Sequence, residues 1–363
     1  MARLSLRQVS KSYGDVEALR GLSLEIRNQE FFVLLGPTGA GKTTSLRCIA
    51  GLEKPESGEV QIDDDVVNSW SAAQRDVALV FQQYSLYPHY TVRENLEFPL
   101  KSKRRNVAPE DIARRVHKAA ETLRISHLLD RRTDRLSGGE MQRVSIGRAI
   151  VREPRLFLMD EPLSNLDAKL RELLRSELKE LQLRLGATLV FVTHDQVEAM
   201  TMGDRIGVLR DGELVQIGTP YEVYNRPCDT FVASFVGAPA INLLEATLDD
   251  GRLIFIPGRF ELPLDPSNLA RIRAAMGARK ALRVGVRPEH VKLLDSGGLE
   301  GTVYGAENHG VETIVTIQIA ERLIRVTVPS NVQVALNQPV RFGFAQDKLH
   351  LFDNDTQENL ARA

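Results

Sequence analysis

Cysteine is scarce in this chain of 363 residues, which has only Cys48 and Cys228. The two cysteines lie far apart and form no C-x-x-C pattern, so the sequence excludes a disulfide framework and a cysteine-based zinc site. We expect both to be small core residues, in a protein that folds in a reducing compartment.

Long apolar runs are also missing, because no stretch approaches the roughly 18 residues that a membrane-spanning helix needs. The first residues, MARLSLRQVSKSYG, alternate in the manner of a strand and contain no apolar signal core. Neither sign of charge dominates: 47 Lys and Arg face 48 Asp and Glu, which leaves a formal net charge of −1. We therefore expect a soluble chain that is not mainly a polyanion-binding protein and that meets a membrane only through a partner.

The sequence GPTGAGKTT at residues 36–44 is a complete G-x-x-x-x-G-K-[ST] phosphate-binding loop. It follows an apolar run at 31–35 and precedes a helix-like stretch at 42–50, which is the context that this motif requires. Glycines let backbone N–H groups converge on a polyphosphate, and the helix start directs its positive dipole end at the same charge. We expect Lys42 to reach the β- and γ-phosphates and the Thr43 hydroxyl to ligate Mg²⁺. The predicted nucleotide-binding residues here are Gly36, Pro37, Thr38, Gly39, Ala40, Gly41, Lys42, Thr43 and Thr44.

A pair of acidic residues follows the apolar run at 156–159, which predicts a buried strand. Asp160 and Glu161 thus stand at the carboxyl end of a strand, the edge where open α/β sheets place ligands. Asp160 is placed to hold Mg²⁺, directly or through water, and Glu161, pointing the other way, is placed to polarise a water against the γ-phosphate. Alone, the pair would be two solvated acids at a strand end; after a phosphate-binding loop it indicates catalysis.

Residues 1–236 alternate strand-like and helix-like segments, which predicts an α/β domain with a mainly parallel sheet. Further strands are expected at 77–81 and 188–193, and helices at 110–124, 140–151 and 168–185. In the last helix, leucines recur at helical spacing and are expected to be core residues. From residue 237 on, short alternating runs between turn-prone segments predict a small, barrel-like antiparallel β-domain that reaches residue 363.

A second anion-binding helix start is predicted at Leu136-Ser137-Gly138-Gly139-Glu140, which precedes the helical sequence MQRVSIGRAI. Ser137 is a natural helix N-cap, and the two glycines expose backbone N–H groups. One chain therefore carries two phosphate-binding helix starts.

At this point the sequence resembles the ATP-binding cassette (ABC) family, whose signature reads LSGGQ or LSGGE. Other elements of that family occur here in the expected order. Gln82 in FQQY matches the glutamine that senses Mg²⁺ and the γ-phosphate, and residues 164–167 match the D-loop. His194 in THD matches the switch histidine, and Tyr13 in KSYG matches the aromatic residue that stacks on adenine.

This resemblance implies a P-loop NTPase fold with a helical subdomain at about 93–150, followed by an OB-fold-like all-β regulatory domain. It implies that ATP and Mg²⁺ are the cofactors and that two copies close head to tail, with the loop of one facing the signature of the other. Two opposed sets of N–H donors neutralise a γ-phosphate better than one set. The implied catalytic residues are Glu161, His194 and Lys42. The implied metal ligands are Thr43, Gln82 and Asp160. The implied further ATP contacts are Tyr13, Gln82, Ser137, Gly138, Gly139, Glu140 and Asp167.

The resemblance covers nearly the whole chain and extends to the ATPase subunits of carbohydrate importers of the maltose, multiple-sugar and glycerol-3-phosphate type. It implies a peripheral protein on the cytoplasmic face of the cell (inner) membrane, held there by two integral-membrane permease subunits. An extracytoplasmic solute-binding protein would deliver a sugar, a polyol or glycerol-3-phosphate. The matching stretches include FQQYSLYPHYTVRENL (81–96), EPLSNLDAKLR (161–171), VTHDQVEAM (192–200), DGELVQIGTPYEVYNRP (211–227), VRPEHV (286–291) and ENHGVET (307–313).

Several alternatives stay open. The residues Tyr84, Leu86, Tyr87, Pro88 and Tyr90 would form a docking patch for a permease, or they are ordinary loop packing. Glu140 and Met141 differ from the residues that are usual at these positions in this branch of the family, and the segment 237–245 differs as well. These differences leave the substrate class open. Importers of sulfate, polyamines or iron share this architecture. An exporter cassette is disfavoured because most exporters fuse the membrane segment to the cassette or lack this β-domain. A cassette acting on nucleic acid or ribosomes is disfavoured by the single cassette and the balanced charge, so no nucleic-acid partner is expected.

Overall fold

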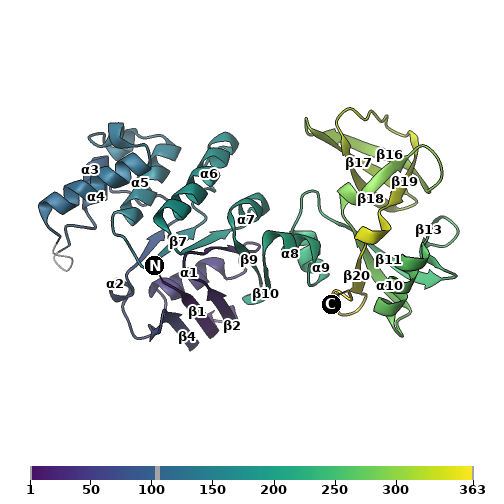
Figure 1. The fold of residues 1–363 in the computed structure, drawn as a ribbon, viewed down its shortest axis with the longest axis horizontal. Coiled ribbons are helices and arrows are strands. Elements are labelled where there is room, and N and C mark those ends of the chain that lie inside the picture. The colour runs from purple at the N-terminus through teal and green to yellow at the C-terminus, as the bar shows by residue number, and fades with distance from the viewer. Residues whose placement is uncertain (1, 103–106, 362–363) are drawn as a thin grey trace. The chain divides into compact units, whose positions relative to one another are not determined.

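The computed structural model describes residues 2–102 and 107–361 and is drawn in Figure 1. The chain divides into two compact units, Met1–Pro220 and Tyr221–Ala363. Buried Arg287 explains why the second unit begins so early, because its guanidinium donates to the carbonyl oxygens of Tyr224 at 2.8 Å and Ala233 at 3.0 Å. The compact units and the predicted domains, which meet at 236/237, are thus divided at different places.

The first unit is built on a six-stranded sheet in the order β10-β9-β3-β8-β7-β6. Its strands are parallel except for β10, which pairs antiparallel with β9. Every residue of β3 and β8 is buried, as expected for parallel strands covered on both faces. The strands are β3 (Phe31–Leu35), β6 (Val77–Val80), β7 (Leu156–Asp160), β8 (Leu189–Thr193), β9 (Arg205–Arg210) and β10 (Glu213–Gly218).

A second, antiparallel sheet in the order β2-β1-β4-β5 belongs to the same unit. Its inward residues, such as Leu4 and Leu24, share one hydrophobic core cluster with Phe32, Leu158 and Val190 of the parallel sheet. This packing places the β1–β2 hairpin against the sheet that carries the phosphate-binding loop. The strands are β1 (Leu4–Tyr13), β2 (Val16–Ile26), β4 (Ser57–Ile62) and β5 (Asp65–Val66).

The helices of the first unit include a group of three, α3, α4 and α5, which contact one another and lie together at one end of this unit (Figure 1). In α6 the leucine stripe is buried at Leu174, Leu178 and Leu181, but Leu173 is 49% exposed, so the core prediction is wrong there. The predicted stripe covers a wider arc of the helix than the face that packs; its members are Leu170, Leu173, Leu174, Leu178, Leu181 and Leu185. The helices are α1 (Lys42–Ala50), α2 (Ala72–Arg75), α3 (Val92–Glu97), α4 (Pro109–Thr122), α5 (Gly138–Ile150), α6 (Ala168–Leu185) and α7 (Gln196–Met202), with 3₁₀ turns at Ser126–Leu128 and Thr133–Arg135.

The second unit is dominated by two five-stranded antiparallel sheets, ordered β13-β12-β11-β14-β20 and β15-β19-β16-β17-β18. Side chains of both sheets and of α10 form one hydrophobic cluster, which confirms the predicted all-β domain. The strands are β11 (Asn242–Asp249), β12 (Arg252–Ile256), β13 (Phe260–Pro263), β14 (Ala281–Val286), β15 (Val291–Leu294), β16 (Leu299–Asn308), β17 (Glu312–Ile319), β18 (Arg322–Pro329), β19 (Pro339–Phe344) and β20 (His350–Asp353). The helices are α8 (Pro220–Asn225), α9 (Thr230–Phe235) and α10 (Pro266–Met276), with 3₁₀ turns at Pro288–His290 and Gln346–Lys348. Across the described part of the chain, no helix combines the length and apolarity needed to cross a membrane.

Candidate functional site

The loop between β3 and α1 has the backbone geometry of a phosphate-binding loop. Gly41 caps α1 with φ 99°, and Gly39 has φ 84°, a region that side chains disfavour. A Cβ on Gly36 would lie 2.4 Å from the carbonyl oxygen of Leu209, and one on Gly41 would lie 2.4 Å from that of Ala18. Neighbouring backbone therefore requires glycine at both ends of the loop.

Lys42 is folded into this loop. Its Nζ atom donates to the carbonyl oxygens of Gly36 at 2.9 Å and Pro37 at 3.0 Å, and it lies 3.6 Å from Oε1 of Glu161. Burial lowers the pKa of Lys42, while the carboxylates of Glu161 and Asp160 act in the opposite direction. The ammonium group is thus fixed at the centre of the loop with an acidic partner beside it.

Thr43 and Asp160 meet across the same edge of the sheet, since the Thr43 hydroxyl donates to Oδ1 of Asp160 at 3.0 Å. Burial raises the pKa of Asp160, an effect that the Thr43 hydrogen bond partly offsets. A hydroxyl and a carboxylate are the oxygen donors that Mg²⁺ prefers, usually completed by water and substrate phosphates. No cluster of three or more His, Cys, Asp or Glu side chains forms a metal site within residues 2–102 and 107–361.

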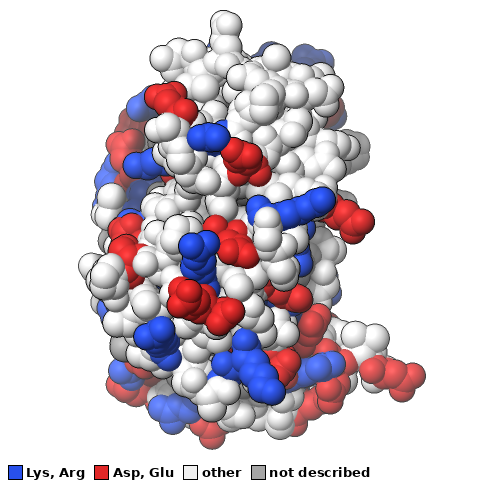
Figure 2. Space-filling model, turned by 90° about the vertical axis from the view of Figure 1, so that its right-hand side faces the viewer, with Lys and Arg blue, Asp and Glu red and all other residues white. Residues whose placement is uncertain are grey.

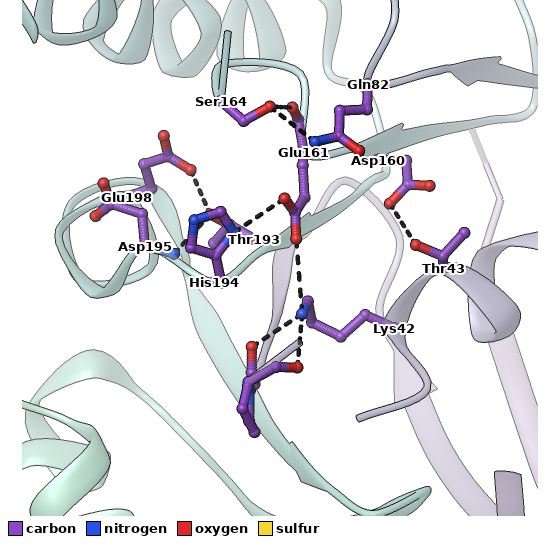
Figure 3. A network of polar contacts seen from close by, with 12 residues as sticks. Lys42, Thr43, Gln82, Asp160, Glu161, Ser164, Thr193, His194, Asp195 and Glu198 are labelled. Carbon is purple, nitrogen blue, oxygen red and sulfur yellow. Dashed lines mark hydrogen bonds and ion pairs between the residues drawn. The ribbon is translucent and has the colours of Figure 1, made fainter. Parts of the chain in front are cut away.

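Glu161 contacts two other predicted catalytic residues at once (Figure 3). Its Oε1 atom faces Lys42, and its Oε2 atom lies 2.9 Å from Nδ1 of His194. Glu161 has φ 44°, an uncommon value for a residue other than glycine. Its N–H donates to the carbonyl oxygen of Val192 at 3.0 Å. This turn directly after β7 sends the carboxylates of Asp160 and Glu161 to different partners.

Gln82 lies on the loop after β6 and is tied to the D-loop. Its Nε2 atom donates to Oγ of Ser164 at 3.3 Å, and Asn165 donates from Nδ2 to the Gln82 carbonyl at 3.0 Å. Ser164 in turn donates to the carbonyl oxygen of Glu161 at 2.9 Å. The prediction did not give Ser164 a site role, although its place three residues after Glu161 in the D-loop was a signal.

A second support was also missed, next to His194. Thr193 donates from Oγ1 to the buried carboxylate of Glu198 at 2.5 Å and accepts the N–H of Asp195 at 2.9 Å. Asp195 caps α7 by accepting the N–H groups of Val197 and Glu198. Together these bonds fix the backbone on both sides of His194. The sequence signal was the spacing of Asp195 and Glu198 in HDQVE, which matches an N-cap residue and the third residue of a helix.

The signature residues form a helix cap and lie outside the network of Figure 3. Ser137 donates its N–H to Oε2 of Glu140 at 2.7 Å, and its Oγ accepts the Glu140 N–H at 3.4 Å, which is the predicted N-cap at α5. A Cβ on Gly139 would lie 2.5 Å from Leu170, so glycine lets α5 start close to α6. Asp167 accepts the Leu170 N–H at 3.0 Å and caps α6. The signature and the D-loop are therefore neighbours.

Tyr13 stands at the end of β1, with its side chain 42% exposed and Nζ of Lys11 5.2 Å from the ring centroid. The same hairpin brings Ala18 of β2 against Gly41, as the close approach above requires. The aromatic ring therefore belongs to the hairpin that borders the loop.

Comparisons with known proteins agree with this geometry. Three family models match the chain: one described as ABC transporter over residues 19–164, one as MalK OB fold domain over 237–291, and one as TOBE domain over 284–352. A dimeric ATP-binding cassette solved with ADP and phosphate is 36% identical, with a TM-score of 0.54 over 60% of this chain and 98% of that one. A cassette of an ABC transporter complex from Clostridium perfringens is 29% identical, with a TM-score of 0.57 over 61% of this chain and 89% of that one.

Full-length relatives are also similar. The chain is 47% identical to the sulfoquinovosyl glycerol transport ATP-binding protein of Agrobacterium fabrum, over 99% of this chain and all of the relative. It is 46% identical to the sn-glycerol-3-phosphate import ATP-binding protein of a Ruegeria species, with the same coverage. It is 45% identical to the trehalose/maltose import ATP-binding protein of Thermococcus litoralis, over 98% of this chain and 99% of that protein. The chain therefore belongs to the ABC transporter family, as an ATP-binding and ATP-hydrolysing subunit with C-terminal OB-fold and TOBE domains.

Proposed function

We propose that ATP is hydrolysed at the edge of the parallel sheet where β3, β7 and β8 end. The observation that carries this proposal is the meeting of Lys42, Glu161 and His194, which three separate strands deliver to one point. Lys42 would hold the β- and γ-phosphates, Glu161 would orient the attacking water, and His194 would hold the γ-phosphate. Tyr13 would stack on the adenine ring.

The contacts of Lys42 indicate how binding prepares the site. A γ-phosphate that engages Lys42 replaces Glu161 as the partner of the ammonium group, now 3.6 Å away. The freed carboxylate oxygen then becomes available to accept a proton from water, while the backbone carbonyls of Gly36 and Pro37 keep the Lys42 chain in place. Substrate binding thus exchanges one ion pair for another and exposes the general base.

We assign Mg²⁺ to the pair Thr43 and Asp160, with Gln82 reaching it from the loop after β6. Bound Mg²⁺ would supply positive charge that offsets the phosphate oxygens. The Gln82 side chain amide is tethered to Ser164 at 3.3 Å, and Ser164 contacts the Glu161 backbone. Contact between Gln82 and the cation would therefore influence the position of Glu161, the residue that would orient water.

The second ATP-binding surface, Ser137 to Glu140 with Asp167, is assigned to the partner copy in a head-to-tail homodimer. Within one chain these residues cap α5 and α6 and contribute nothing to the network around Lys42 in Figure 3. The exposed start of α5 carries N–H groups and a positive dipole end that suit a γ-phosphate. Two copies would then enclose two nucleotides.

The dimer would drive import through two permease subunits that receive solute from an extracytoplasmic binding protein, with the ATPase held at the cytoplasmic face of the membrane. An aromatic cluster of Tyr87, Tyr90 and Phe98, each more than a third exposed, suits the predicted permease contact. The names of the full-length relatives favour a sugar, a polyol or a glycerol phosphate as solute. No nucleic-acid partner is proposed, because 47 Lys and Arg are balanced by 48 Asp and Glu over the whole chain. On the face drawn in Figure 2, acidic and basic side chains are interspersed.

The test is ATPase activity of the complex reconstituted in vesicles with its permeases and its binding protein. Activity should rise at least severalfold with binding protein loaded with one sugar, polyol or glycerol phosphate, and stay basal with the unloaded protein. Stimulation by sulfate, a polyamine or iron instead would replace the solute assignment and leave the ATPase assignment intact. Activity independent of any loaded binding protein would remove the importer assignment.

A further inference from the structure

A polar hollow of about 430 Å³ lies within the second unit. Its walls come from α8 and the residue after it, from α10, from the 3₁₀ turn Pro288–His290, from the segment 347–350 and from the C-terminal end. Near this end, Asn359 donates from Nδ2 to the carbonyl oxygen of Pro227, two residues after α8, at 2.7 Å. The volume falls in the range of small-molecule sites, roughly 300–1,000 Å³, and the function proposed above makes no use of it.

Positive charge exceeds negative charge in this hollow. Arg226, Arg271 and Lys348 line it against a single carboxylate, that of Asp347. Lys348 approaches Asp347 only to 3.6 Å, and both side chains are more than half exposed. An exposed ion pair of this kind is weak, so Lys348 stays available to an anion. One carboxylate also leaves the lining of the hollow with a net positive charge.

Arg271 is fixed in place without being neutralised. Its guanidinium donates to the carbonyl oxygens of Leu349 at 3.1 Å and Gln346 at 2.8 Å, and also to the side-chain oxygen of Asn268. All these acceptors are uncharged, and Arg271 forms no ion pair within the part of the chain that the structure describes, although the carboxylates of Asp347 and Asp265 act on its charge from a longer distance. A guanidinium held in this way keeps its full charge and loses little further freedom when an anion binds.

Two histidines add neutral N–H donors to the wall. Burial, with help from Arg287, His290 and Arg271, lowers the pKa of His350 to about 4. Burial lowers the pKa of His290 as well, and its Nδ1 atom is buried without a hydrogen-bond partner in the described residues. Both rings are therefore mainly neutral at pH 7. Around His350 the charges of Arg287 and Arg271 disfavour a further positive charge, and an anion would offset them, whereas the Glu289 carboxylate acts in the opposite direction on both rings.

We propose that this hollow binds a phosphate-type oxyanion, carried by a small phosphate monoester or present as inorganic phosphate, with Arg271 and Lys348 as its charge partners. A phosphate dianion offers several acceptor oxygens and suits a site with two or three cations and imidazole donors, whereas a carboxylate is satisfied by a single guanidinium. The site is separate from the phosphate-binding loop and does not depend on which solute is transported. A ligand here would hold α8, the first helix of the second unit, against the β-domain.

The test is isothermal titration of the full-length protein saturated with a non-hydrolysable ATP analogue, which fills the phosphate-binding loop. The probes are sn-glycerol-3-phosphate, inorganic phosphate and uncharged glycerol. One saturable site is expected for at least one of the two phosphate compounds and none for glycerol. Tighter binding of glycerol-3-phosphate identifies an ester site, and equal or tighter binding of inorganic phosphate identifies a site for the free anion.

Two variants and a matched control locate the binding. Arg271→Gln should weaken it at least about tenfold, as expected for loss of a charge-assisted contact. Lys348→Gln, at an exposed position where folding is not at risk, should weaken it severalfold. Arg273→Gln changes an exposed arginine of the same helix and should have no effect. The proposal is overturned if neither phosphate compound binds, if Arg271→Gln and Lys348→Gln leave the affinity unchanged, or if Arg273→Gln weakens binding equally.

Discussion

The Nδ1 atom of His194 lies 2.9 Å from the Oε2 atom of Glu161, although the two residues follow different strands, β8 and β7. The other oxygen of the same carboxylate faces Lys42, which follows a third strand. Glu161 is thus a shared partner of the two groups that would hold the γ-phosphate. A nucleotide that binds Lys42 and His194 would have to compete with this carboxylate, which would link occupancy of the site to the state of the proposed general base.

Replacing Glu161 with Gln removes the proton acceptor while keeping the size and the amide hydrogen-bonding capacity of the side chain. We expect turnover to fall roughly 10²–10⁴-fold, equivalent to about 3–5 kcal/mol, with ATP binding retained. The measurement is single-turnover hydrolysis beside equilibrium binding of a fluorescent ATP analogue. Glu172→Gln, at an exposed position of α6, should hydrolyse ATP normally. Near-normal turnover of Glu161→Gln would remove that residue from its assigned role.

Asp160→Asn keeps a partner for the Thr43 hydroxyl but removes the charge that would bind Mg²⁺. The Mg²⁺ concentration that gives half-maximal ATPase activity should rise by at least about tenfold, in line with losses seen at metal sites. A magnesium titration at fixed ATP gives this value. Asp250→Asn, in the exposed β11–β12 turn of the second unit, is the control and should titrate like the unchanged protein. An unaltered magnesium requirement in Asp160→Asn would place the cation elsewhere.

Dimer formation should depend on the signature cap. The Glu161→Gln protein with magnesium-ATP should sediment as a dimer, and adding Ser137→Ala should raise the dimer dissociation constant by about tenfold or more, because one donor to the γ-phosphate is lost. Thr91→Ala is a matched control, since Thr91 also caps a helix, α3, in a capping box but is not in the signature. Both changes remove a cap worth about 1 kcal/mol of stability. If both variants lose the dimer equally, the effect is a general loss of helix stability.

His350 should make the second unit sensitive to acid. Burial lowers its pKa to about 4 from an ordinary 6.5, so between these pH values the unfolded chain binds more protons than the folded one. Stability is therefore complete above pH 6.5, falls as the pH drops toward 4, and loses about 2 kcal/mol between pH 7 and pH 5 from this residue.

Scanning calorimetry at pH 7 and pH 5 tests this assignment, because it compares how much stability each variant and the unchanged protein lose between the two pH values. His350→Gln should lose less stability on acidification than the unchanged protein, whatever its stability at pH 7. His309→Gln, at a position about half exposed, should keep the original pH dependence. An identical pH dependence in His350→Gln would show that another group carries the acid sensitivity.

Elements whose signals are local could be predicted from the sequence. The loop at 36–44 needs glycine because of φ values and close backbone approaches at those positions. Ser137 caps α5 through the next turn of its own helix, and the buried runs of β3, β7 and β8 are short enough to identify by their apolarity. The chemical roles of the site residues were inferred from the same motifs and stay predictions that the variants above test.

Contacts between distant segments needed the tertiary structure. The sheet order sets β8 between β3 and β7, and this order, which no local pattern encodes, brings Lys42, Glu161 and His194 together. The same holds for the exposure of Leu173, for Arg287 gathering α8 and α9 into the second unit, and for the hollow around Arg271. Residue type and spacing by themselves determined the local elements, namely the glycine loop, the helix caps and the buried strands, because those properties act over a few residues. Only packing of the folded chain decided which of these groups meet, because strand neighbours are chosen by the burial of whole faces.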